Sequence, residues 1–174
     1  SARRSVSASQ PSCAAFALPL RGVSLASNGW AKARMTTRGW EHFEHGADIG
    51  VRGVGPTLEA SFEEAAIALT AVVADPVTVR PLTSIAIACE APARDILLVD
   101  FLNAVIYAMA TTGLLFAAFS VTIDGNRLRA EARGEPFDAG RHDAAVEVKG
   151  ATFTELKVER LADGRWCAQC VVDV

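Results

Sequence analysis

Residues 43–73 read FEHGADIGVRGVGPTLEASFEEAAIALTAVV, and this stretch decides the fold because its hydrophobic pattern changes at Pro56. Before Pro56 the residues alternate loosely and include several glycines, which indicates an extended segment that ends in a loop. After it, Thr57 is the expected N-cap of a surface helix with one buried face. The apolar positions of that helix recur at spacings of three and four: Leu58, Phe62, Ala65, Ala66, Leu69, Val72 and Val73.

A second helix is predicted between Asp95 and Gly113, two residue types common at the beginning and the end of a helix. Its apolar stripe is wider than that of the first helix: Leu97, Leu98, Phe101, Leu102, Val105, Ile106 and Met109. The apolar run of residues 96–110 is too short for a membrane helix, and Asp100 and Asn103 interrupt it. We therefore expect a chain without a membrane partner.

The other segments have the pattern of strands. Residues 83–91 alternate until Pro92 ends them. Asp124-Gly125 lies between two alternating runs, which is a strong hairpin signal because both residues tolerate positive φ. Three more extended runs complete the chain: 144–153, 154–161 and 165–174. The sequence thus predicts an α+β fold, with two helices packed on a largely antiparallel or mixed β-sheet.

We expect one folded domain, residues 35–174. Residues 1–34 are rich in serine, alanine and arginine and show no sustained hydrophobic period, which predicts a disordered N-terminal extension. Two origins are open for this extension. It is an over-extended start, with Met35 as the true first residue, or an organellar targeting segment, which is typically rich in arginine and serine and poor in acids.

Charge is distributed unevenly along the chain. Residues 1–40 contain six basic residues and no acid, whereas residues 41–174 contain 11 basic and 20 acidic residues, a net charge of −9. An acidic surface repels phosphate backbones. Direct binding of nucleic acid is therefore not expected unless a bound cation or a basic partner intervenes.

Two small groups of side chains could carry chemistry. His42 and His45 lie in an extended segment, where a histidine is more often solvated or hydrogen-bonded than a ligand or base. Asp48, at the junction of strand and loop, is either a loop cap or an oxygen ligand. Cys167 and Cys170 lack the second ligand pair of a zinc site and the following helix of a redox motif, so we interpret them as small side chains on opposite faces of a strand. The sequence shows no disulfide framework, which favours a reducing compartment such as the cytoplasm.

Residues 43–73 resemble the opening of the archease family, whose signature is His-x-Ala-Asp-Ile-Gly followed by a helix with Leu-Glu-x-x-Phe-Glu-x-Ala-Ala. The resemblance continues in family order through four more segments: DILLVDFLNAVIY (95–107), GEPFDAGRH (134–142), EVKGATF (147–153) and VVDV (171–174). It covers roughly residues 40–174. Departures are small: Phe101 stands for the usual Trp, Gly46 for the usual Thr, and Gly150 interrupts the usual Lys-Ala-x-Thr run.

The resemblance implies a function. Archeases are small activators, and not themselves enzymes, of the RtcB-type RNA ligase, which joins RNA ends in tRNA splicing and RNA repair with GTP and a divalent metal. A chain of this family would promote guanylylation of the ligase and multiple turnover, and would meet RNA only through the ligase. The resemblance also implies a metal site at Asp48, Asp173 and Val174. Oxygen ligands of this kind favour Ca²⁺, with Mg²⁺ or Mn²⁺ as alternatives.

Further polar residues belong to motifs that the family shares: His45, Arg141, His142, Glu147 and Lys149. They would contact the ligase or support the metal ligands, and the alternative is a solvated edge of the sheet. Two other functions stay open at this point. The chain could be a metal-dependent phosphoester hydrolase with His45 or His142 as general base, or a chaperone-like binding module without metal.

Overall fold

The computed structural model describes residues 38–144 and 146–174, so the extension predicted for residues 1–34 lies outside the described residues. The described chain contains the following elements in order: β1 (Gly39–His45), β2 (Asp48–Gly55), α1 (Leu58–Val73), the short 3-10 helix η1 (Pro76–Thr78), β3 (Thr83–Glu90), α2 (Arg94–Thr112), β4 (Leu114–Asp124), β5 (Arg127–Pro136), β6 (Gly150–Ala151), β7 (Lys157–Arg160) and β8 (Trp166–Asp173).

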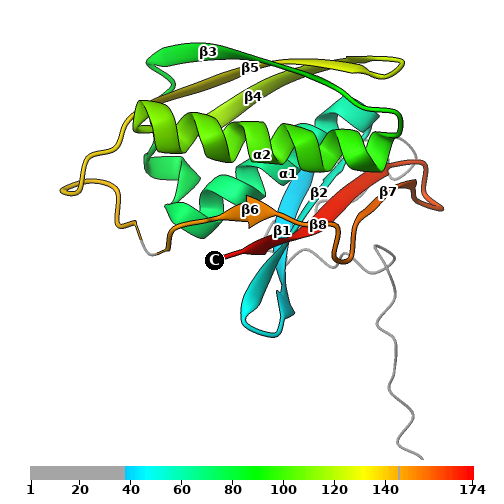
Figure 1. Cartoon of the computed structure of the whole chain (residues 1–174), viewed down its shortest axis with the longest axis horizontal. Coiled ribbons are helices and arrows are strands. Elements are labelled where there is room, and N and C mark those ends of the chain that lie inside the picture. Colours follow the sequence, from blue (N-terminus) through cyan, green and yellow to red (C-terminus); the bar gives the residue numbers. More distant parts are fainter. Residues whose placement is uncertain (1–37, 145) are drawn as a thin grey trace, which may run out of the picture.

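The strands form two sheets in which every pairing is antiparallel. One sheet has the order β1-β2-β8-β6, with β7 also paired to β8, and the other has the order β3-β5-β4. Figure 1 shows both helices between the two sheets. The predicted α+β fold with two helices and antiparallel strands is confirmed, although the strands divide between two sheets instead of one.

Helix α1 begins as predicted, because the Thr57 hydroxyl accepts a hydrogen bond of 3.1 Å from Ala60 N. The expectation of a surface helix with one buried face is wrong. Ser61 and Thr70 are also fully buried, because α1 has strands on both sides. The Thr70 hydroxyl donates to the carbonyl of Phe116 on β4 at 2.6 Å, while the opposite side of the helix packs on β2.

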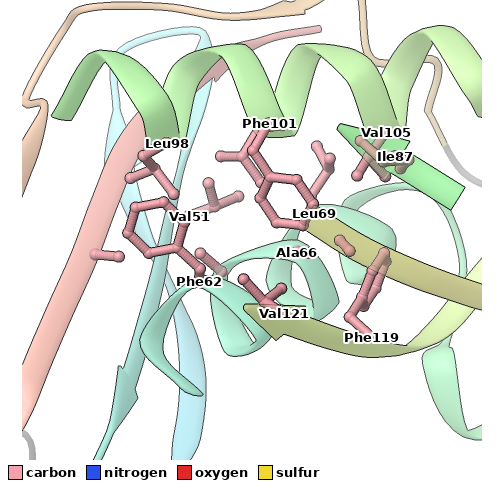
Figure 2. Close-up of a cluster of buried hydrophobic side chains, with 14 of the residues drawn as sticks. Val51, Phe62, Ala66, Leu69, Ile87, Leu98, Phe101, Val105, Phe119 and Val121 are labelled. Atoms are coloured by element: carbon pink, nitrogen blue, oxygen red, sulfur yellow. The ribbon is translucent and has the colours of Figure 1, made fainter. Parts of the chain in front are cut away.

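Helix α2 ends as predicted at Gly113, but it begins at Arg94 after the N-cap Ala93, so Asp95 lies in its first turn and does not open it. The Asp95 carboxylate accepts from Ile96 N at 2.8 Å, and Gly113 ends the helix with a φ of 68°. By length and composition alone, α2 is apolar enough to cross a membrane, which we did not expect from its interrupted run. Core helices of soluble proteins share this property, and Figure 2 shows Leu98, Phe101 and Val105 of α2 pointing into the core.

Aromatic rings join the layers of the core (Figure 2). Phe62 of α1 stacks on Phe101 of α2, with ring centroids 6.4 Å apart. Phe101 also meets Phe119 of β4 edge to face at 6.3 Å. Val51 of β2 closes the core on the side of the larger sheet, where it is fully buried. Phe101 therefore contacts both its partner helix and the smaller sheet.

We expected the glycines near residue 50 to form a loop. They lie instead within strand β2. A Cβ atom on Gly50 would lie 2.3 Å from the ring of Phe43 on β1. A Cβ atom on Gly53 would lie 2.2 Å from the backbone nitrogen of Ala65 on α1. These glycines therefore serve close packing of β2 against its neighbours, which explains why a strand here is rich in glycine.

Two other strand predictions need correction. The β4–β5 hairpin exists, but its two-residue turn is Gly125-Asn126, with Gly125 at a φ of 57°, and not Asp124-Gly125. The long strands predicted for 144–153 and 154–161 shrink to the short β6 and β7.

Strand β8 is the predicted final strand, and its two cysteines face opposite ways as expected. Cys170 packs in the main core, while Cys167 packs with Val54 in a separate cluster. Cys89 and Cys170 are free thiols.

Candidate functional site

The two acids predicted as metal ligands lie on neighbouring strands. The antiparallel pairing of β2 with β8 places Ile49 opposite Val172. One position further along this ladder, Asp48 begins β2 and Asp173 ends β8, so the two acids are cross-strand neighbours. Figure 1 shows the C-terminus beside the β1–β2 hairpin. The two acids, from opposite ends of the described chain, therefore lie at the same end of two neighbouring inner strands, a place we call the Asp48–Asp173 edge.

His45 belongs to the same row of side chains. It pairs with Asp48 across the β1–β2 hairpin, and paired residues point to the same face of a sheet. Gly46 takes a φ of 63° at the first position of the two-residue turn, where a type II′ turn favours glycine. Because Ile49 and Val51 pack on the core, the row of His45, Asp48 and Asp173 faces away from the helices.

The end of the chain is fixed in place. The side chain of Val174 packs against the main core. The backbone nitrogen of Lys149 donates to the carbonyl of Asp173 at 2.9 Å, and its Nζ donates to an oxygen of Val174 at 2.9 Å. Lys149 thus places an ammonium group against the oxygen that the resemblance assigns to the metal.

Asn103 of α2 supports this arrangement, and we did not single it out in the sequence. Its side-chain oxygen accepts from Ala151 N at 2.9 Å, and its side-chain nitrogen donates to Ala151 O at 3.2 Å. Ala151 belongs to β6, in which Gly150 pairs with Asp173. The signal available in the sequence was an amide within the apolar stripe of a helix, where a polar group needs a partner.

Arg141 and His142 contact another cluster, centred on Glu135 at the end of β5. The Glu135 carboxylate is almost fully buried and accepts from Arg80 N at 2.8 Å, Arg80 Nε at 2.9 Å and Arg141 Nη2 at 2.7 Å. The hydrogen bonds from Arg80, and then those from Arg141, hold the pKa of Glu135 well below its usual range. Sequence reasoning missed Arg80 and Glu135, because no local pattern links residues so far apart.

His142 is fully buried, so it does not lie on a solvated sheet edge. Its Nδ1 accepts from the backbone nitrogen of Asp138 at 3.0 Å. The ring proton therefore lies on Nε2, which faces Glu135 Oε1 at 3.2 Å. These hydrogen bonds hold the segment after β5 against β5, so His142 has a structural role.

Glu147 lies elsewhere again. It is exposed and lines an apolar cavity together with residues of α1, α2 and β4. Of the five supporting residues predicted from the sequence, His45 and Lys149 therefore join Asp48 and Asp173, whereas Arg141, His142 and Glu147 do not.

The donor atoms at the Asp48–Asp173 edge suit a hard cation. Two carboxylates and a terminal oxygen of Val174 are the oxygen ligands that Ca²⁺, Mg²⁺ and Mn²⁺ prefer, with water completing the coordination. Within residues 38–144 and 146–174, no three side chains of His, Cys, Asp or Glu are grouped so that they alone could hold a metal. An oxygen of Val174 would therefore have to be part of the ligand set.

Comparison with known proteins identifies the family. Residues 40–174 match the archease protein family. Protein archease of Pyrococcus furiosus is 44% identical over 141 residues, covering 79% of this chain and 99% of that protein. Protein archease of Thermococcus gammatolerans is 41% identical, with the same coverage.

A solved structure agrees. The solution structure of protein 1598 from Methanobacterium thermoautotrophicum superimposes with a TM-score of 0.67 at 29% identity, covering 78% of this chain and 99% of that one. The family match over residues 40–174 spans both sheets and both helices and includes Asp48 and Asp173. This chain belongs to the archease protein family.

Proposed function

We propose that this protein activates an RtcB-type RNA ligase through a divalent-cation site formed by Asp48, Asp173 and a terminal oxygen of Val174, with Ca²⁺ as the favoured ion. One observation carries the proposal: Asp48 and Asp173 are cross-strand neighbours beside a chain end that is held in place. Like charges directly opposite each other destabilise a sheet. A cation between them would remove this cost.

The residues around the acids would have distinct parts in binding. Asp48 and Asp173 supply the negative charge, and the packed side chain of Val174 keeps the terminal oxygen beside them. Lys149 neutralises that oxygen before a cation arrives and must release it on binding. Residues 41–174 carry a net charge of −9. A bound cation would add positive charge at the point where the ligase or a phosphate group contacts the protein.

Membership of the archease family supports the ligase as the partner, because activation of this ligase is what the resemblance implies. On this proposal the protein works in the cytoplasm, contacts RNA only through the ligase and performs no chemistry of its own.

The test uses purified protein, a cognate RtcB-type ligase, GTP and metal. Guanylylated ligase and joined RNA are measured with and without a stoichiometric amount of the protein. We expect no ligation by the protein alone, and more than one turnover per ligase when it is present. An unchanged rate on stoichiometric addition contradicts the proposal.

The variant Asp48→Asn tests the metal site within the same assay. We expect it to lose most of the activation, while Glu44→Gln, which removes a nearby exposed charge on the opposite face of β1, keeps it. Hydrolysis of a phosphoester by the protein alone would instead support the hydrolase. Full activation by Asp48→Asn would support a binding module that needs no metal.

A further inference from the structure

An apolar cavity of about 530 Å³ lies where α1 and α2 end, and it shares no lining residue with the Asp48–Asp173 edge. Its walls come from both helices, the start of β4 and the segment between β5 and β6, and include Leu69, Val73, Ile106, Met109 and Leu115. Figure 1 shows the segment between β5 and β6 beside the C-terminal end of α2. The volume is within the range of ligand-binding pockets, about 300–1,000 Å³.

The cavity opens to solvent through an apolar rim. Phe137 and Val146 line it and are 46% and 37% exposed. Ala110 of α2 also lines it and is exposed. Tyr107, 71% exposed, precedes Ala110 by three positions and so lies on the same face of α2. An apolar surface that continues from a cavity across a helix is typical of a site for another protein chain.

Glu147 is the one charged residue among those lining the cavity. Its carboxylate is exposed and makes no hydrogen bond or ion pair with another residue of the described ranges 38–144 and 146–174. Asp143, four positions earlier, is exposed as well. The two bases of the same segment are engaged elsewhere, since Lys149 Nζ donates to an oxygen of Val174 and Arg141 is paired with Glu135 and Asp138. The rim therefore presents unneutralised negative charge beside an apolar cavity.

We propose that this cavity receives an apolar side chain of a protein partner, and that a lysine or arginine next to that side chain pairs with Glu147. The apolar walls provide the affinity and the carboxylate selects the neighbouring residue by charge. The partner is the RNA ligase, and only this assignment rests on the proposed function. The cavity would then be a second contact with the ligase, separate from the metal site.

The chemistry of the cavity is tested without the ligase, by NMR titration with three blocked dipeptides: Leu-Lys, Leu-Gln and Leu-Glu. We expect the methyl signals of Met109 and Leu115 to shift, with Leu-Lys bound about three- to fivefold more tightly than Leu-Gln, as for an exposed ion pair, and Leu-Glu most weakly. Glu147→Gln should abolish this order. Asp124→Asn, which removes an exposed charge at the far end of β4, should preserve it.

The absence of shifts at the cavity, or equal affinity for Leu-Lys and Leu-Glu, overturns the proposal. The assignment to the ligase is tested by calorimetry of the complex. Ala110→Trp places a large side chain in the mouth and should weaken ligase binding at least about tenfold, because hot-spot anchors contribute that much. Ala88→Trp makes the same change at an exposed position of β3 and should have little effect.

The possible failures can be told apart. If the unmodified protein does not bind the ligase, the proposed function fails, while the dipeptide titration still decides whether the cavity selects an apolar group beside a cation. If the ligase binds Ala110→Trp as tightly as the unmodified protein, the cavity is not the ligase contact. Both tryptophan variants change exposed positions, and their melting temperatures check that the fold is intact.

Discussion

Asp48 on β2 and Asp173 on β8 each lie one position beyond the paired residues Ile49 and Val172, so the two ends of the described chain place two acids on neighbouring strands. The β1–β2 turn at Gly46 holds one side of this pair, and the packed Val174 holds the other. Two facing carboxylates would repel each other and cost stability without a cation. This edge of the sheet is therefore the feature on which the proposed function depends.

Lys149→Met should raise the affinity for Ca²⁺. The Lys149 ammonium lies against an oxygen of Val174, and a fixed positive charge there opposes an arriving cation. We expect about a two- to fivefold gain by calorimetry, because an exposed charge pair contributes about 0.2–1 kcal/mol. Lys157→Met, which removes an ammonium near Glu155, should leave the affinity unchanged. A lower affinity in Lys149→Met would show that Lys149 supports the metal and does not compete with it.

Asn103→Ala should loosen β6 and the end of the chain. The variant loses both hydrogen bonds to Ala151, worth about 1 kcal/mol each, so the free energy of unfolding should fall by about 1–2 kcal/mol in a urea titration. Amide exchange at Lys149 and Ala151 should accelerate. Asp100→Ala, exposed on the same helix, is the control. Unchanged exchange would mean that β6 is held by β8 alone.

Glu135→Gln should lower the melting temperature by several degrees at neutral pH, since it removes the charge that Arg80 and Arg141 share. A carboxyl whose pKa is lowered by folding stabilises the fold fully above its unfolded pKa, about 4.3, and less as pH falls toward the folded pKa. The difference between the unmodified protein and the variant should therefore narrow below about pH 4.3. Melting curves of both proteins from pH 7 to pH 3 measure this difference in melting temperature.

The control for this variant is Glu131→Gln on the same strand. Glu131 is more than half exposed and pairs only loosely with Arg133, at 3.8 Å, so its loss should have a smaller effect. A difference between the unmodified protein and Glu135→Gln that stays constant across the whole pH range would contradict the pKa assigned to Glu135.

A short Gly-Ser extension after Val174 should lower ligase activation several-fold. The added residues convert the terminal carboxylate to an amide and crowd the acids, whereas an ordinary chain end tolerates extension. The side chain of Val174 still packs on the core, so the melting temperature of the metal-free protein should change little. Full activation by the extended protein would exclude a role for the terminal carboxylate.

Local patterns predicted the helices well. The spacing of apolar residues placed α1 and α2, and the caps at Thr57 and Gly113 with the acid Asp95 in the first turn of α2 placed their ends to within a residue, because these signals act over a few residues. The glycines of β2 were misread because their cause is the ring of Phe43 and the backbone of α1, which no local pattern reveals. Strand β6 likewise hydrogen-bonds to Asn103, which lies far away in the sequence.

The candidate site shows the same division. Asp48, Asp173 and Val174 were assigned through resemblance to a family, and their adjacency depends on a pairing of β2 with β8 that periodicity alone does not predict. The Glu135 cluster was missed because a buried carboxylate gathers partners according to the tertiary fold. Residues close in the sequence also separate in the structure: Glu147 lines the apolar cavity, whereas Lys149 contacts Val174.

The most direct test of the account is the number of RNA molecules joined per ligase in the presence of Asp173→Asn. This change keeps the shape of the side chain and removes one of the two charges facing each other between β2 and β8. The account predicts at least a severalfold fall relative to the unmodified protein, with a melting temperature without metal that is equal or slightly higher because one repelling charge is gone, while Asp124→Asn activates fully. Full activation by Asp173→Asn would contradict the assignment of this edge as the functional site.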